Sequence, residues 1–325
     1  MASALEKGTL ADISILIVAY RRPFNVEKIL YSSKLAGFTK LYITLDAPKD
    51  ASGKAFDDHG KTIEVVETFE RQTGITVNKR YFESNHGCAV SLITGIDWVL
   101  SDSQKIIILE DDCLPTDNFF EFIVNKMPFL ENSSDIWLIC GTQFAPEQIT
   151  RGSSPISRFA LTWGWATTKE RWKEIRPSFY DKPNHLNLRD IFALTPKQAF
   201  WTAGYRRAHQ GFTDVWDTVL IQRMHQMRKF AILPSVSLVL NVGNDEVSTH
   251  VPGNSQWTNR IPVGSIENIH SDPAKNSRVD SWLENSFYGI RIRHVLTTKL
   301  TLLLDLFFSK RRRKFESSLS SRLAI

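Results

Sequence analysis

The first half of this chain alternates short apolar segments with stretches of helical spacing, and this pattern constrains the fold more than any other feature. Residues 13–19 (ISILIVA) form a continuous apolar run rich in β-branched side chains, typical of a strand buried on both faces. Residues 25–36 follow at helical spacing. The same order recurs, with strands predicted at 41–45, 76–82 and 106–109 and helices between them at 61–72 and 89–100. The alternation predicts an α/β fold with a mostly parallel central sheet and flanking helices.

After residue 112 the pattern becomes irregular. The sequence still predicts helices at 118–126, 196–209 and 214–227 and strands at 136–140, 229–233 and 235–242. Gly, Ser and Pro are frequent in 146–155 and, together with Asn, in 243–277, and both segments are predicted as surface loops. A chain of 325 residues with 42% hydrophobic composition can bury one large core. We therefore expect a leader over 1–12, one α/β domain over 13–285, and an amphipathic helix with a basic tail over 286–325.

The cysteines and the N-terminus bear on the cellular compartment. Cys88, Cys113 and Cys140 are odd in number, lie far apart and form no C-x-x-C pair, so neither a disulfide framework nor a zinc knuckle is expected. The N-terminal residues MASALEKGTLAD contain no apolar core of a signal peptide, and no run reaches the roughly 20 apolar residues of a spanning helix. These features predict a cytoplasmic protein.

The positive charge is concentrated in the tail. Of 40 Lys and Arg residues, nine lie in 291–325, which holds only two acids, so the tail carries +7 and the rest of the chain −2. A local patch of this kind does not favour nucleic-acid binding by the folded body. Leu296, Leu300, Leu303 and Phe307 share a predicted helix face just before Lys310–Lys314. This pattern predicts peripheral docking on an anionic membrane at its cytoplasmic face, with a helix packed on the domain or on a second subunit as the alternative.

Three adjacent acids form the strongest local signal. Glu110, Asp111 and Asp112 directly follow the strand at 106–109, and they would repel one another without a cation or hydrogen-bond donors. Open α/β sheets bind ligands at this end of their strands. Carboxylate oxygens favour Mg²⁺ or Mn²⁺, which could bridge to a diphosphate. The alternative is that the acids cap the helix at 118–126, although Asp117 already suits that role.

The segment ILEDDCLPTDNFF resembles the DXD motif of GT-A glycosyltransferases, in the E-D-D form of the N-acetylglucosaminyltransferase I family. Over about residues 12–250 the chain is similar to bacterial family-2-like enzymes of cell-surface polysaccharide synthesis. The resemblance implies a Rossmann-like GT-A domain, with Asp112 as the metal ligand and with Glu110 and Asp111 facing the ribose and nucleotide. The R-x-x-R-W motif of processive synthases is absent.

The same resemblance implies a set of donor-binding residues. The first strand and its loop, ISILIVAYRRP, resemble the nucleotide-binding segment of the family, an acid follows LYITL, and an N-x-G element precedes a helix. The residues so implied are Ala19, Tyr20, Arg22, Asp46, Asn85 and Gly87. A strand-end Asp is also an ordinary turn former, and N-x-G would also suit a helix cap with a tight turn.

Two later segments point to the acceptor and to a further ligand. In LTWGWATTKERW the tryptophans could stack on sugar rings beside a glycine, and the resemblance favours Gly164 and Trp165; the alternative is a tryptophan core cluster. His250 ends NVGNDEVSTH, where many GT-A enzymes have a histidine that completes the metal or diphosphate site. It could equally be a loop residue without such a role.

The resemblance also places a catalytic base. Asp217 in VWDTVL matches the expected position, and Asp214 is its competitor three residues earlier. Together these features predict metal-dependent, inverting transfer of a sugar from a nucleotide-sugar, with UDP favoured, to a saccharide or lipid-linked acceptor. A sugar nucleotidyltransferase is one alternative, but residues 19–23 contain none of the glycines that cradle a triphosphate. A non-catalytic carbohydrate-binding module of the same fold is the other.

Overall fold

The computed structural model describes residues 10–180, 186–209, 216–243, 261, 263–266, 269–290 and 298–304. The first half alternates strand and helix, in the order β1 (Ile13–Ala19), α2 (Pro23–Leu35), β2 (Leu41–Leu45), α3 (Lys54–Thr73), β3 (Val77–Tyr81), α4 (Cys88–Asp102) and β4 (Lys105–Glu110). Each strand and helix predicted for this half is confirmed, with ends that shift by a few residues. The largest shift is in α3, which begins seven residues before the predicted position 61.

The second half contributes shorter elements. They are β5 (Cys113–Pro115), α5 (Asp117–Asn132), β6 (Ile136–Cys140), α6 (Glu147–Thr150), β7 (Pro155–Ser157), β8 (Trp165–Thr168), α7 (Lys169–Ile175), η1 (Arg176–Phe179), α8 (Leu188–Ala193), α9 (Pro196–His209), α10 (Trp216–Met227), β9 (Phe230–Ile232), β10 (Val239–Asn241), β11 (Ala274–Lys275), α11 (Ser277–Trp282) and η3 (Leu283–Phe287).

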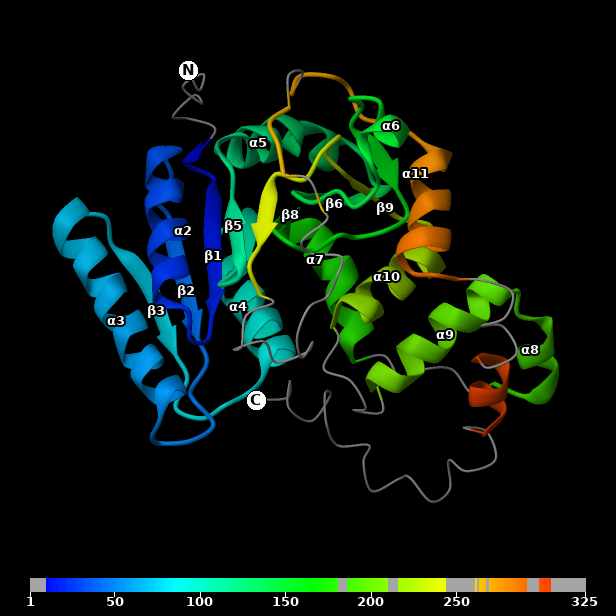
Figure 1. Cartoon of the computed structure of the whole chain (residues 1–325), viewed down its shortest axis with the longest axis horizontal. Coiled ribbons are helices and arrows are strands. Elements are labelled where there is room, and N and C mark those ends of the chain that lie inside the picture. The colour runs from blue at the N-terminus through cyan, green and yellow to red at the C-terminus, as the bar shows by residue number, and fades with distance from the viewer. Residues whose placement is uncertain are drawn as a thin grey trace.

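Nine of the described strands form one sheet in the order β11-β7-β9-β6-β8-β4-β1-β2-β3, and β5 and β10 form a separate pair (Figure 1). β4, β1, β2 and β3 run parallel, and β1 lies between β2 and β4. The chain therefore builds outward from β1 to β3 and then returns across β1 to form β4, which makes the β1/β4 boundary the point where the strand order reverses. The predicted α/β class with a mostly parallel sheet is confirmed.

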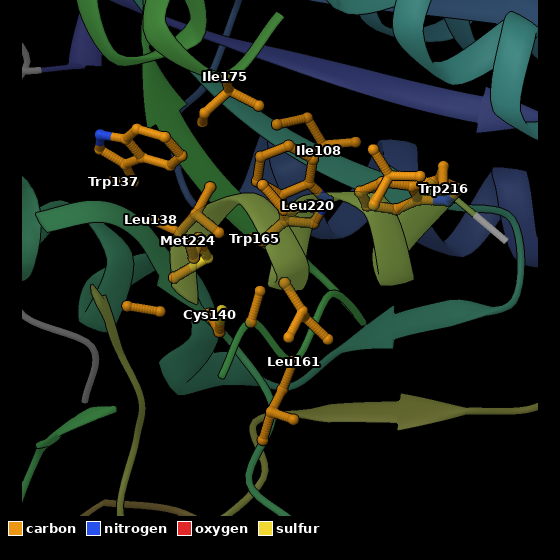
Figure 2. Packing of buried hydrophobic residues seen from close by; sticks show 14 of the residues in the cluster. Ile108, Trp137, Leu138, Cys140, Leu161, Trp165, Ile175, Trp216, Leu220 and Met224 are labelled. Carbon is orange, nitrogen blue, oxygen red and sulfur yellow. The ribbon is translucent and has the colours of Figure 1, made fainter. Parts of the chain in front are cut away.

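Side chains alternate across the strands, so both faces of the sheet are covered. Ile13, Ile15 and Ile17 pack in a core with α2, α3 and α5, whereas Leu16 and Val18 pack in a second core with α4, α7 and α10. All five are less than 9% exposed. Figure 2 shows part of the second core, where side chains of α10 meet those of β4, β6 and β8. This two-sided burial is why the first strand reads as an unbroken apolar run.

Two late predictions are corrected. The strand predicted at 235–242 shrinks to β10, which leaves the main sheet and pairs antiparallel with β5, Val239 opposite Pro115. The predicted loop at 146–155 contains the single turn α6 and ends in β7, which pairs with β9. Both short strands depend on partners distant in sequence, and local patterns carry little information about such pairing.

The predicted amphipathic face of the tail is described only in part, over residues 298–304. Residues 298–304 are helical, and Leu302, not Leu300, is buried, at 2% and 55% exposed respectively. Leu302 packs with Ile191 of α8 and Ala199 of α9, and this contact decides which side of the helix turns inward. The predicted positions 296, 307 and 310–314 lie outside the described residues. No helix within the described ranges has the length and apolarity to cross a bilayer.

Gly164 should tolerate no side chain. Its φ is +66°, and an added Cβ would lie 2.8 Å from Cγ2 of Val239 and 3.0 Å from Cε2 of Phe119. We expect Gly164→Ala to lower the free energy of unfolding by about 1–2 kcal/mol for the left-handed backbone and a further ~1–3 kcal/mol for overpacking. Gly152, at φ +70° with open space around it, is the matched control, because Gly152→Ala should incur only the backbone cost. Equal losses in denaturant unfolding would contradict this packing.

Candidate active site

The candidate site lies where the carboxyl ends of β1 and β4 meet. Val18 pairs with Glu110 in the parallel register, so the residues that follow the two strands emerge side by side. The strand order reverses at this boundary, and open α/β sheets bind their ligands in the crevice at such a point. The tertiary structure therefore brings the predicted nucleotide-binding segment, residues 19–22, against the acidic triplet.

Asp111 holds the two segments together. Its Oδ2 accepts hydrogen bonds from the backbone N–H of Tyr20 (2.8 Å) and Arg21 (3.2 Å), and its Oδ1 pairs with the guanidinium of Arg22 (2.9 Å). The Asn25 side chain donates to the Asp111 carbonyl at 2.8 Å. Asp111 is 5% exposed, so both carboxylate oxygens serve the protein itself. Its predicted contact with a nucleotide stays a prediction, and its structural role is to fix the loop after β1.

Asp46, at the end of β2, repeats this arrangement one strand away. Its carboxylate accepts hydrogen bonds from the backbone N–H of His86 and Gly87, both at 2.8 Å, and from the Asn85 amide at 3.2 Å. Asn85 also donates to the Ala47 carbonyl at 2.7 Å. Asp46 is 4% exposed and thus positions the turn that starts α4. Any contact of Asp46, Asn85 or Gly87 with uracil, ribose or phosphate stays a prediction.

Glu110 faces an unfavourable electrostatic environment. Burial raises its pKa to about 8, and the negative charges of Asp112, Asp111 and Asp217 add to the effect. The Cys88 thiol, at the start of α4, donates to Oε2 at 3.3 Å and opposes the shift. The charge of Asp217 acts on Glu110 from α10, so the predicted base faces the same region as the acidic triplet.

Asp112 shares this excess of negative charge. Burial raises its pKa, the neighbouring Asp111 adds to the rise, and Arg22 opposes it. Mg²⁺ is usually held through one or two carboxylates together with substrate phosphates and water. Among the residues that the structure describes, no group of three or more His, Cys, Asp or Glu side chains has a metal-binding arrangement. Asp112 with Glu110 beside it fits the mode in which a diphosphate completes the coordination.

The end of β10 closes over Asp112. The Val242 N–H donates to the Asp112 carbonyl at 2.9 Å, and a Cβ on Gly243 would collide with Oδ2 of Asp112. Only glycine lets the backbone approach the carboxylate so closely. His250 follows seven residues later and lies outside the described residues. Its role as a ligand stays a prediction. Gly243, the last described residue before it in the sequence, lies against the Asp112 carboxylate.

The predicted acceptor residues Gly164 and Trp165 lie in the core. Trp165 is 0% exposed and stacks on Trp216 of α10, with ring centroids 5.7 Å apart (Figure 2). A fully buried ring offers no face to a sugar, so in this conformation Trp165 supports α10, and Gly164 permits tight packing. Asp217 follows Trp216, and this stack therefore positions the predicted base. The rival, Asp214, lies outside the described residues.

Several residues of the site gave no usable signal in the sequence. Cys88 contacts Glu110, Asn25 holds the backbone of Asp111, and Gly243 lies against Asp112. Burial raises the pKa of Tyr288 well above its usual range, and the charge of Asp217 adds to the rise. Each contact joins positions more than twenty residues apart. For Gly243 the sequence predicts only the start of a surface loop, and not the contact with Asp112.

Comparison with known proteins gives distant structural likenesses. No family model and no curated protein sequence matches the chain. Glucosyl-3-phosphoglycerate synthase from Mycobacterium tuberculosis, in complex with phosphoglyceric acid, is 13% identical at a TM-score of 0.33, over 52% of this chain and 63% of the synthase. The same synthase has been solved with Mg²⁺ and uridine diphosphate, at 14% identity and a TM-score of 0.33, over 50% of this chain and 59% of that one. The chain thus spans less than two thirds of that enzyme.

The nucleotidyltransferase likenesses are wider in coverage. A putative glucose-1-phosphate thymidylyltransferase from Bacillus anthracis is 10% identical at a TM-score of 0.42, over 80% of this chain and 100% of that one. 4-Diphosphocytidyl-2C-methyl-D-erythritol synthase from Anaerococcus prevotii is 8% identical at 0.40, over 74% and 94%. Likenesses at this level do not assign an activity to the chain.

The charge on Glu110 should make the metal-free protein less stable in alkali. An unfolded glutamate has a pKa near 4.5, whereas the folded value is about 8, so between these values the folded state holds more protons and stability falls as pH rises. Glu110→Gln cannot ionise but keeps an acceptor for Cys88. We expect its melting temperature to equal that of the wild type near pH 5 and to exceed it near pH 9, both in a chelator. Glu64→Gln, at an exposed position of α3, is the control. An unchanged pH profile in Glu110→Gln would contradict this environment.

Proposed function

We propose that this chain is a metal-dependent glycosyltransferase of the GT-A type, which transfers a sugar from a nucleotide-sugar to a saccharide acceptor. The observation that carries the proposal is the pair of acids Glu110 and Asp112 at the point where the strand order reverses, with the charge of Asp217 acting on Glu110 from α10. Burial and these like charges raise the pKa of Glu110, and a bound cation would compensate the negative charge. A divalent ion with a nucleoside diphosphate supplies this compensation at the place where the fold binds ligands.

Asp112 would hold the ion, and the loop after β1 would hold the nucleotide. Bound Mg²⁺ or Mn²⁺ supplies charge stabilisation of the diphosphate that leaves. The loop at residues 20–22 is fixed beforehand by Asp111, so little conformational freedom remains to be lost on binding. The turn at 85–87, fixed by Asp46, presents the start of the 15-residue helix α4, whose positive end favours a negatively charged ligand.

Asp217 would act as the general base on the acceptor. Its carboxylate takes the proton of an acceptor hydroxyl, the hydroxyl oxygen bonds to the anomeric carbon, and the bond from that carbon to the diphosphate oxygen breaks. The nucleoside diphosphate leaves with the electron pair. A direct displacement of this kind inverts the anomeric configuration. The location of Asp217 next to the acidic edge, on a helix held by the tryptophan stack, supports this role.

The geometry of the loop favours a glycosyltransferase over a sugar nucleotidyltransferase. A nucleotidyltransferase must hold a triphosphate, and backbone N–H groups of a Gly-rich loop commonly do so. Here the N–H groups of Tyr20 and Arg21 donate to Asp111 and are not directed at a ligand. A non-catalytic module would differ from both of these enzymes because it would turn over neither set of substrates. Incubation with a panel of nucleotide-sugars, and separately with nucleoside triphosphates plus sugar 1-phosphates, tests the three. Sugar 1-phosphate consumption with pyrophosphate release would overturn the proposal.

Removal of the Asp112 charge should weaken metal-dependent nucleotide binding. We expect Asp112→Asn to weaken UDP binding in the presence of Mn²⁺ by a factor on the order of 10 or more, because a principal ligand of the ion becomes neutral. Isothermal titration calorimetry with and without Mn²⁺ measures the effect. Asp117→Asn, at the exposed first residue of α5, is the matched control and should bind as the wild type does. UDP binding that is unaffected by Mn²⁺ and equally strong in all three proteins would reject the assignment.

Removal of the Asp217 carboxylate should strongly reduce turnover and leave the affinity for the donor nearly unchanged. We expect Asp217→Asn to lower kcat by a factor on the order of 10² or more with little change in donor affinity, since a general base contributes mainly to the chemical step. Asp214→Asn is the comparison and should retain turnover. NMR coupling constants of the product should show an anomeric configuration opposite to that of the donor. A retained configuration, or a fully active Asp217→Asn protein, would exclude this base.

A further inference from the structure

Two short helices in the second half of the chain expose an unusual share of large apolar side chains. Leu188 and Phe192 of α8 are 46% and 65% exposed, and Leu300 and Leu304 of the helix at 298–304 are 55% and 48% exposed. Within the described ranges ten large hydrophobic side chains are exposed to this degree, and these two helices supply four of them. Single exposed leucines are ordinary on a protein surface, but a concentration of this kind marks an interaction site.

Contacts on the buried side of these two helices keep the four side chains on the exposed side. Ile191 of α8 and Leu302 pack into a small core with Ala199 and Ala203 of α9. The ammonium of Lys299 donates to the Phe192 carbonyl at 3.0 Å, which places the two helices side by side. Residues four apart share a helix face, so the two exposed residues of each helix project together. We call Leu188, Phe192, Leu300 and Leu304 the α8 face.

The start of α8 is fixed by its own sequence. Asn187 and Asp190 form a capping box, in which each side chain accepts a hydrogen bond of 2.9 Å from the backbone N–H of the other. A six-residue helix is not stable by itself, and this cap together with buried Ile191 supplies the support. The apolar exposure of Leu188 and Phe192 is therefore a property of a folded element.

We propose that the α8 face docks on an anionic lipid surface. The charge of the neighbouring sequence supports this partner: Lys310–Lys314 are five consecutive basic residues that begin six residues after Leu304, and Arg189 is exposed on α8 itself. Apolar side chains that enter the headgroup region, with basic residues beside them, match an anionic bilayer. The face differs from the one the sequence predicts, because Leu188 and Phe192 come from α8 and Leu303 turns partly inward.

A second copy of the chain fits this face less well. A symmetric dimer through the α8 face would bring the exposed Arg189 of each copy to one interface, where like charges repel. Lipid headgroups of phosphatidylglycerol type supply the opposite charge. The inference is independent of the catalytic proposal, since none of the four side chains belongs to the candidate active site.

Vesicle co-sedimentation with matched double variants tests the proposal. The test variant is Leu188→Ser with Phe192→Ser. The control is Leu35→Ser with Phe56→Ser, which removes one leucine and one phenylalanine, 86% and 48% exposed, from α2 and α3 on the opposite side of the molecule (Figure 1). We expect the wild type and the control to sediment with vesicles of phosphatidylcholine and phosphatidylglycerol. The test variant should bind these vesicles more weakly by a factor on the order of 10, because it loses two inserted apolar side chains.

The salt dependence of vesicle binding and a second double variant distinguish apolar insertion from purely electrostatic binding and from dimer formation. Attraction to the basic cluster fades at high salt, whereas apolar insertion persists, so the difference between test and control should remain at high salt. Leu300→Ser with Leu304→Ser should reproduce the loss, and thermal melting should be unchanged in all variants that retain these inner contacts. Equal binding of test and control variants, or no binding of the wild type, would overturn the proposal. A concentration-dependent dimer that only the test variants lose would assign the face to a second copy and overturn it as well.

Discussion

The hydrogen bonds to the Asp111 carboxylate fix the geometry on which the rest of the candidate site depends. They join the loop after β1 to the end of β4 across about ninety residues of sequence. A buried carboxylate is stable only when donors surround it, and here two backbone N–H groups and the Arg22 guanidinium do so. Asp46 acts in the same way for the turn before α4. Asp111 and Asp46 thus fix the two backbone segments at the candidate site. Glu110 and Asp112 are the acids proposed to bind the ligands there.

The charge of this site opposes the stability of the fold. Glu110 and Asp112 are acids whose pKa values are raised by burial and by neighbouring carboxylates, and the raised pKa of Glu110 records the free-energy cost. Binding of a cation with a diphosphate would offset that cost, which couples ligand binding to stability. Active sites commonly store charge in this manner, because a group that is already paired within the protein cannot respond to a substrate.

The second half of the chain adds β8 and the helices α8, α9 and α10 to the parallel strands of the first half. β8 runs antiparallel beside β4 and places Trp165 beneath Trp216, so α10 begins next to the acidic edge. The same half carries α9, which packs against α10 on one side and against α8 with residues 298–304 on the other. The proposed catalytic base and the α8 face therefore belong to one helical layer.

The sequence by itself determined the α/β class, the strands from 13–19 to 106–109, and the acidic edge at 110–112, because periodicity and strand ends depend on near neighbours in the chain. It did not show which of these acids bind groups of the protein itself and which face the candidate site. Asp111 turns inward because its donors come from Tyr20 and Arg21, and the sequence offers no sign of that distant contact. The burial of Trp165, the pairing of β10 with β5 and the choice of Leu302 as the inward residue were likewise decided by tertiary packing. A side chain's role at these positions depends on which remote element covers it, and only the folded chain determines that.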